Sequence, residues 1–170
     1  MATHTKYLVA GAMAMALTAL APPAAAHHSF AMFDASKTYV LTGVVLGVSP
    51  DSNHLHVFFA PLNEERTEVV RGADGEPLRW SVEMDPASVA ARYGLTADSF
   101  PRGTVFSIGL HPLRSGEPGG GRGKNGLFKC PADAAPAPGK HCDSVPGATS
   151  HGNGVLPAGA EPPPHLDAAR

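Results

Sequence analysis

Cysteine and charged residues are scarce in this sequence, and each shortage excludes a class of protein. Only two of the 170 residues are cysteines, Cys130 and Cys142, which are too few for a metal site built from thiolates alone. Charged residues make up 16% of the chain, and lysine and arginine form no cluster. This composition argues against nucleic acid or an anionic membrane as a partner. In an oxidising compartment the two cysteines are predicted to form one disulfide bond.

Long apolar runs are also missing. No segment is apolar over the roughly 20 residues that a membrane-spanning helix needs. The apolar run from Tyr7 to Leu20 follows Lys6 and is followed by the small residues Ala24 to Ala26. A basic start, a short apolar run and a small-residue cleavage site are typical of a secretory signal peptide. We therefore expect residues 1–26 to be removed on export, and the mature protein to be periplasmic or secreted.

The remaining chain is long enough for one modest core of about 100 residues followed by a tail. We expect a β-barrel domain over residues 27–113. Residues 114–170 are rich in Gly, Pro and Ala and are expected to form a tail with one disulfide loop. A second domain is not expected, and the protein is expected to be a monomer.

Alternation of apolar and polar residues predicts the strands of this domain. Trp80 shares an apolar face with its second neighbours in the chain and is therefore expected in the core. From Tyr39 to Val48 the even-numbered residues share one face, with Gly43 and Gly47 on the other. The predicted strands are Tyr39–Val48, His54–Ala60, Leu78–Met84 and Thr104–Leu110, with Leu127–Lys129 as a short edge strand.

A short helix is predicted between the third and fourth strands. Asp85 followed by Pro86 is a typical helix start, because Asp caps the first turn and Pro is tolerated at its first position. The helix is expected to run to about Tyr93 and to end at Gly94, with Val89 facing the core.

The order of these elements is typical of one architecture. Three strands, a helix and two further strands match a small five-stranded antiparallel barrel of the oligonucleotide/oligosaccharide-binding (OB) type. Glycines within the first strand predict curvature or a bulge, which small barrels require. The expected fold class is therefore all-β with one short helix, an OB-like barrel, and a β-sandwich is the alternative.

The C-terminal part of the sequence has few residues that build a core. The segment from Gly116 to Asn125 does not fit a phosphate-binding loop and is expected to be a flexible link. Residues 147–170 are expected to be disordered, so that truncation after Val145 should change stability little. His141 and His151 are interpreted as solvated.

The most informative feature is a pair of histidines that signal cleavage would place at the start of the mature chain. Cleavage after Ala26 exposes the amino group of His27 beside His28. A terminal amine and imidazoles form a nitrogen chelate that favours copper, with zinc as the second choice. Cleavage one residue earlier would make His28 the third residue, which is also a copper-binding arrangement. The segment Phe30–Lys37 is expected to form an ordered arm.

Three further histidines and one glutamate are expected on the outward face of the barrel. His54 and His56 lie on the polar side of the second strand, Glu83 on that of the third, and His111 on that of the fourth. The arm that follows the amino-terminal histidines is expected to cover this surface and to complete a metal site. Solvated histidines explain the same pattern, and Glu83 is also interpreted as the partner of a nearby arginine.

Five short motifs recur in an order and spacing that resemble a known family. They are His27-His28-Ser29-Phe30, Thr42-Gly43-Val44-Val45, Trp80-Ser81-Val82-Glu83, Arg92-Tyr93-Gly94-Leu95, and Gly103 to His111-Pro112-Leu113. They are similar to those of a bacterial domain-of-unknown-function family of small exported proteins, over roughly residues 26–120. Members commonly have Asn-Pro-His where this chain has Asn53-His54-Leu55-His56, so that either His54 or His56 is the equivalent histidine. The resemblance implies export and a small β fold, and it brings no established activity.

Together these observations predict an exported protein that binds copper through His27 and His28 and one or more of His54, His56 and His111. The alternative is an envelope module that binds a ligand or another protein and in which the histidines are incidental. A third hypothesis is a copper-dependent oxidative enzyme, which needs an open coordination position. No catalytic residue is predicted, and the binding protein is the leading hypothesis.

Overall fold

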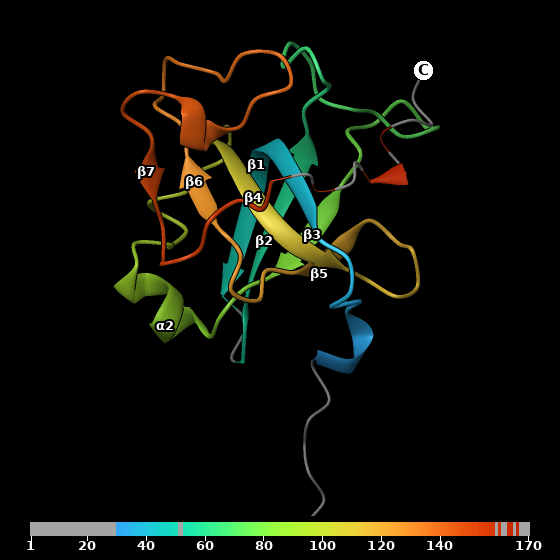
Figure 1. Cartoon of the computed structure of the whole chain (residues 1–170), viewed down its shortest axis with the longest axis vertical. Coiled ribbons are helices and arrows are strands. Elements are labelled where there is room, and N and C mark those ends of the chain that lie inside the picture. The colour runs from blue at the N-terminus through green and yellow to red at the C-terminus, as the bar shows by residue number, and fades with distance from the viewer. Residues whose placement is uncertain (1–29, 51–52, 159, 161–162, 165, 167–170) are drawn as a thin grey trace, which may run out of the picture.

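The structure is a computed structural model, and it describes residues 30–50, 53–158, 160, 163–164 and 166. The predicted signal peptide, His27 and His28 lie outside the described residues. The described chain consists mostly of strands with one short α-helix (Figure 1). Within those ranges, no helix has both the length and the apolar character needed to cross a membrane.

Five strands close into a barrel. They pair in the order β1-β2-β3-β5-β4, and β4 pairs again with β1. The helix α2 (Ala87–Arg92) lies between β3 and β4 in the chain, as predicted. The barrel strands are β1 (Tyr39–Pro50), β2 (Leu55–Pro61), β3 (Trp80–Glu83), β4 (Val105–Pro112) and β5 (Gly119–Gly121).

The predicted small all-β barrel is confirmed, with one difference in strand direction. Four of the barrel pairs are antiparallel, and the pair β3–β5 is parallel. A closed ring with an odd number of strands cannot alternate direction all the way around, so at least one pair must be parallel. The expectation of a purely antiparallel five-stranded barrel was therefore wrong on geometric grounds.

The barrel interior is packed with aromatic and branched side chains. Trp80 is 1% exposed, which confirms its predicted place in the core. The Phe59 ring packs edge-on against Phe106, with 5.1 Å between ring centroids, and Phe106 also meets Phe100 edge-on at 6.2 Å. Such edge-to-face contacts add to the free energy of burial.

Strand β1 contains the bulge that its glycines predict. Its register against β2 shifts between Val45 and Gly47. Leu41 and Val45 are buried before the shift, whereas Val48 packs against the core after it. The interpretation of one continuous face along even-numbered residues was therefore wrong, because an extra residue in one strand inverts the alternation.

Strand β5 lies in the segment that was expected to be a flexible link. A side chain at Gly120 would collide with the carbonyl group of His111, and one at Gly121 would lie 2.7 Å from the ring of Phe33. Glycine allows this close approach of neighbouring elements, which is why a strand without side chains can close the barrel. The predicted fifth strand is instead β6 (Leu127–Lys129), which pairs with β4 outside the barrel ring.

The C-terminal segment continues the same sheet. Strand β7 (Thr149–Ser150) pairs with β6, and between them lies the 3₁₀ turn η2 (Cys142–Ser144). Cys130 and Cys142 form the predicted disulfide. Leu166 packs against the core. For the described residues beyond 147, the expectation of disorder was wrong, because they hydrogen-bond to and pack on the barrel.

Helix α2 differs from its prediction in its cap and in its buried face. Its N-cap residue is Pro86, and no side chain caps the first turn. Asp85 instead accepts a hydrogen bond from the Tyr93 hydroxyl at 2.7 Å, so the predicted cap was wrong. Val89 is 37% exposed, whereas Ala90 is fully buried. The small side chain of Ala90 lets the helix backbone lie close to the barrel.

Candidate functional site

A row of residues crosses four neighbouring barrel strands. His56 of β2 is the register partner of Glu83 in β3. Glu83 lies opposite Gly121 of β5, and Gly121 lies opposite His111 of β4. The row contains three of the side chains predicted for a metal site, with a glycine between Glu83 and His111.

The amino-terminal arm docks on that glycine. The 3₁₀ turn η1 (Phe30–Met32) leads into Phe33, whose ring takes the place that a side chain at Gly121 would occupy. Phe33 is only 7% exposed, and the next amide, that of Asp34, donates to the carbonyl oxygen of Pro112 at 2.8 Å. The predicted arm is therefore fixed on the outside of the barrel where β3, β5 and β4 run side by side (Figure 1).

His111 contacts the arm directly. Its Nδ1 lies 2.8 Å from the carbonyl oxygen of Lys37, so the ring N–H donates to that carbonyl. Its Nε2 lies 3.5 Å from the side-chain amide nitrogen of Asn125, which can donate to it. A proton on Nδ1 leaves the lone pair on Nε2, which is the atom that a metal ion would take.

His54 is oriented in a similar way. Its Nδ1 lies 2.9 Å from the carbonyl oxygen of Met84 and 3.4 Å from Oε1 of Glu83. His56 Nδ1 lies 3.4 Å from Oγ of Ser81. The carboxylate of Glu83 therefore contacts a histidine, not the arginine that was expected, because the register of β2 against β3 places histidines beside it.

The predicted metal ligands are only partly brought together. His56 and His111 are separated by three strand spacings, or about 14 Å along the sheet at ~4.8 Å per spacing. Across the described ranges, no three His, Cys, Asp or Glu side chains form a group that could hold a metal ion. A site that includes His27 and His28 lies outside what the structure describes.

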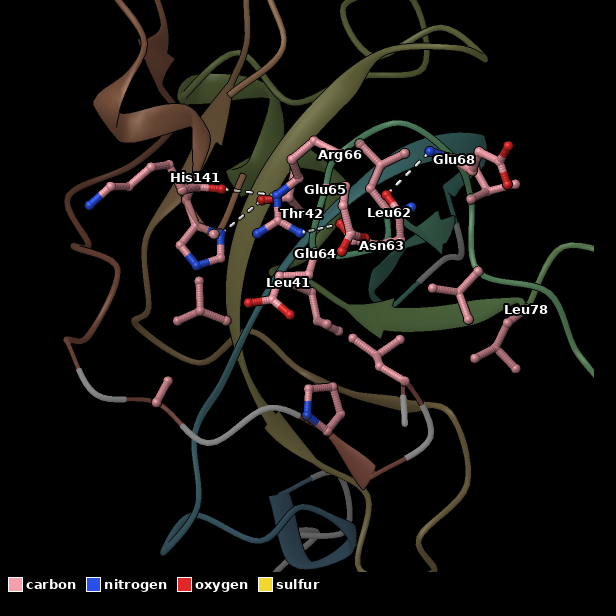
Figure 2. A pocket seen from close by; sticks show the side chains of 18 of the residues that line it. Leu41, Thr42, Leu62, Asn63, Glu64, Glu65, Arg66, Glu68, Leu78 and His141 are labelled. Carbon is pink, nitrogen blue, oxygen red and sulfur yellow. Dashed lines mark hydrogen bonds between the residues drawn. The ribbon is translucent and has the colours of Figure 1, made fainter. Parts of the chain in front are cut away.

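A cavity of 1720 Å³ opens on another part of the barrel surface. It lies between the outer face of β1, the β2–β3 loop and the segment Gly139–Ser144 at the end of the disulfide loop, and described residues from Leu156 to Leu166 also line it (Figure 2). On its wall, Thr42 Oγ1 lies 2.8 Å from Nδ1 of His141 and 2.7 Å from Oγ of Ser107. The backbone N–H of Cys142 donates to Ser107 at 2.8 Å, so the C-terminal segment is held by buried polar contacts.

His141 is thus not solvated, contrary to its interpretation from the sequence. Burial lowers its pKa below the ordinary value, the Arg66 charge acts in the same direction, and Asp143 opposes them. Arg66 lies in the β2–β3 loop, where its Nε donates to the carbonyl oxygen of Lys140 at 3.0 Å. Burial also lowers the pKa of Arg66, while Glu64 and Glu65 raise it.

His151 is the second histidine whose position differs from the expectation. Its Nδ1 lies 3.0 Å from the carbonyl oxygen of Tyr93, and its ring meets Phe100 edge-on at 4.8 Å. Burial lowers the pKa of His151. Close by, the buried Arg122 lies 3.5 Å from Asp85 and its guanidinium stacks on Tyr93. Burial first, and then the hydrogen bond to Asp85, raise the pKa of Tyr93.

The sequence does contain one signal for the position of the half-buried His141. Thr42 and Ser107 are polar residues within two otherwise apolar strands, and they are register partners in the structure. A polar pair on the outside of a barrel that is buried must be hydrogen-bonded to a covering segment. Which segment covers the pair is decided by the disulfide and the fold of the tail, which alternation does not predict.

Comparison with known proteins identifies the relatives of this barrel. The chain matches a family described as a family of unknown function, DUF6152, over residues 14–122. The chain belongs to this family. The predicted resemblance to a domain-of-unknown-function family is thereby confirmed. Neither curated proteins nor solved structures provide a significant match.

The part that matches DUF6152 ends directly after β5. It therefore includes every barrel strand, the arm with Phe33 and the row that carries Glu83 and His111. The disulfide, His141 and His151 follow the matched part. The barrel and its arm lie within the matched part, and the described residues beyond 122 lie outside it.

Proposed function

We propose that the mature protein is an exported metal-binding protein that holds one copper ion at its amino terminus. The ligands are the terminal amine and imidazole of His27, the imidazole of His28, and Nε2 of His111. The disulfide between Cys130 and Cys142 supports export, since such bonds persist in oxidising compartments. The docking of Phe33 on Gly121 is the observation that carries the proposal.

The docked arm gives the histidines a short path to the barrel. His28 is two residues before Phe30, where the 3₁₀ turn η1 begins, and two extended residues span at most about 7 Å. Phe33 lies over a residue that is the register partner of His111. We therefore propose that the histidines approach the exposed side of the His111 ring from the start of η1.

The hydrogen bonds of His111 are those expected of a histidine that binds a metal ion. Histidines that bind metals usually donate their second ring N–H to a carbonyl or carboxylate oxygen, which fixes the ring and raises its basicity. Lys37 provides such a carbonyl at 2.8 Å, and it belongs to the same arm. Movement of the arm and orientation of the ligand are therefore coupled.

His54 is the second choice for the barrel ligand. Its ring N–H is directed to the carbonyl of Met84 and the carboxylate of Glu83, so its Nε2 is also the nitrogen left for a metal. In this arrangement Glu83 orients a ligand and does not bind the ion itself. His54 and His111 lie on opposite sides of the docked Phe33, so one ion is expected to use one of them.

Copper is favoured over zinc because an amine and imidazoles in one short chelate bind divalent metals in the usual order of affinities, in which copper binds more tightly than zinc.

Calorimetry of metal-free mature protein, with its start verified by N-terminal sequencing, tests the proposal. We expect one copper ion to bind with micromolar or tighter affinity. Addition of one residue before His27 should weaken binding, since the terminal amine is then moved. Absence of copper uptake by the correctly processed chain would refute the proposal.

A further inference from the structure

The wall of the cavity beside β1 presents a fixed guanidinium. Arg66 donates from Nε to the carbonyl oxygen of Lys140 at 3.0 Å and from Nη1 to that of Asn63 at 2.8 Å. Its backbone has φ 62, in the left-handed region that arginine rarely adopts. The backbone of Arg66 is therefore strained, and its partly buried guanidinium is held beside the cavity. The negative charges of Glu64 and Glu65 act on this guanidinium.

A chain of hydrogen bonds next to Arg66 leads to His141. Ser107 is fully buried and accepts from the backbone N–H of Cys142, and its Oγ lies 2.7 Å from Oγ1 of Thr42, where either hydroxyl can donate. Oγ1 of Thr42 also lies 2.8 Å from Nδ1 of His141. We take the arrangement in which Ser107 donates to Thr42 and Thr42 to Nδ1, which leaves the proton of a neutral imidazole on Nε2. In this arrangement His141 is a second donor.

Apolar side chains form part of the remaining wall of the cavity. Leu62 and Val70 contribute to it, and each is at least nine-tenths buried. Leu78 lies further along the cavity (Figure 2). A concave site with an apolar lining and a few convergent polar groups is the usual form of a small-molecule site.

We propose that this cavity binds an amphipathic monocarboxylate, with the carboxylate on Arg66 and His141 and the apolar body along Leu62 and Leu78. The guanidinium of Arg66 donates hydrogen bonds, so the ligand must supply acceptor atoms. A guanidinium fork matches a carboxylate in geometry and charge. This inference is independent of the proposed copper site.

Acidic residues in the same loop narrow the class of ligand. Glu64, Glu65 and Glu68 also line the cavity, and all three are exposed. In Figure 2, Glu68 lies at the opposite end of the cavity from His141. Glu64 and Glu65 already act on the charge of Arg66, so the head group binds there against their repulsion, and a second negative charge further along the ligand would add repulsion from Glu68.

Decanoate, below its micelle concentration, is the probe for this site, with decanol, decylamine and acetate as comparison ligands. Titration calorimetry on mature protein freed of metal with EDTA is expected to show binding of decanoate. Decanol lacks the charge and acetate lacks the apolar body, so each should bind at least tenfold more weakly. Decylamine should not bind. Equal affinity for decanoate and decanol, or no binding of decanoate, would overturn the proposal without the use of any variant.

Arg66→Gly is the informative substitution, because glycine adopts the left-handed backbone without strain while the guanidinium is removed. We expect decanoate affinity to fall at least tenfold, since hydrogen bonds to charged groups are lost. Arg71→Ala is the matched control, because Arg71 lines the same cavity and donates to the carbonyl of Gly75. Unchanged decanoate affinity in Arg66→Gly would overturn the assignment of the head group.

The proposed copper site and the proposed carboxylate site can be tested independently. A form of the protein extended by one residue before His27 should lose copper affinity and keep decanoate binding. Loss of decanoate binding in that form would contradict a cavity that acts alone. Arg66→Gly should leave copper binding unchanged.

Discussion

The ring of Phe33 fills the space above Gly121 that a side chain at that position would otherwise occupy. The two residues are far apart in the sequence, and their contact fixes the start of the described chain against the strand that closes the barrel. Each residue constrains the other, because a larger residue at 121 would displace the ring and a smaller one at 33 would leave a gap.

Phe33→Ala should therefore loosen the arm. We expect a loss of about 2–3 kcal/mol in the free energy of unfolding, since a buried aromatic side chain contributes roughly this much. Denaturant unfolding measures this loss, and hydrogen exchange at the Asp34 amide, which is bonded to Pro112, should accelerate. Phe30→Ala is the matched control in the same arm, because Phe30 is 71% exposed and its removal should cost less than about 0.5 kcal/mol. Equal effects of the two substitutions would mean that Phe33 does not anchor the arm.

Alternation predicted the barrel strands because their inward residues had to be apolar. The prediction for β6 matched the observed strand, and those for β1 to β4 differed only at the ends. Trp80 was placed correctly because its strand contains no bulge. The outward positions of His56, Glu83 and His111 also followed from alternation, whereas their alignment in one row comes from the strand register through β5.

The alternation of apolar and polar residues did not predict the segments that are held in place by something other than an apolar face. Strand β5 consists of glycines, so it has no pattern to detect, and its place is set by the close approach of His111 and Phe33. The C-terminal segment is held by a disulfide and by isolated polar contacts, not by an apolar face. For the same reason His141 and His151 were misjudged.

A substitution in the barrel core should destabilise the protein much more than one on its surface. Trp80→Ala is expected to cost about 3–5 kcal/mol, which is enough to unfold most of a domain with a typical stability of ~5–10 kcal/mol. Val89→Ala on the exposed side of α2 is the control and should change stability by less than about 0.5 kcal/mol. Chemical denaturation monitored by circular dichroism gives both values. A small effect of Trp80→Ala would contradict its burial.

Stability should depend on pH through the two half-buried histidines, His141 and His151. Burial lowers the pKa of His141 and of His151 in the folded protein, below the ordinary value of 6.5. As the pH falls through 6.5 the unfolded state binds protons first, so stability decreases, whereas above about pH 7.5 neither state is protonated and the effect is absent. Melting temperatures measured from pH 7.5 to 5.5 should fall, and the slope should be smaller in His141→Gln and His151→Gln. An unchanged slope in both variants would contradict the burial of these rings.

Truncation after Val145 should now be destabilising, in contrast to the expectation from the sequence. It removes β7, the ring of His151 from Phe100, and the hydrogen bond from the amide of Gly126 to the carbonyl of Val155 at 2.8 Å. We expect the melting temperature to fall by at least about 5 °C, which corresponds to roughly 1–2 kcal/mol for a chain of this size. Val155→Ala is the control, because that side chain is 74% exposed. A truncated protein that melts with the full chain would restore the view of a dispensable tail.

Thermal unfolding with and without copper distinguishes the candidate barrel ligands. Copper that binds only the folded protein raises its stability by mass action, about 2.7 kcal/mol at a free concentration one hundred times the Kd. His111→Ala should reduce this rise, because the ring joined to the arm through Lys37 is lost. His56→Ala should leave it unchanged, since His56 is three strands away in the row. The two rings are matched in chemistry and in partial burial, so a difference between the effects of His111→Ala and His56→Ala reports position alone.

If His54→Ala reduces the rise and His111→Ala does not, the ion is held on the other side of Phe33. Equal rises in all three variants would confine the ion to an amino-terminal chelate without a barrel ligand.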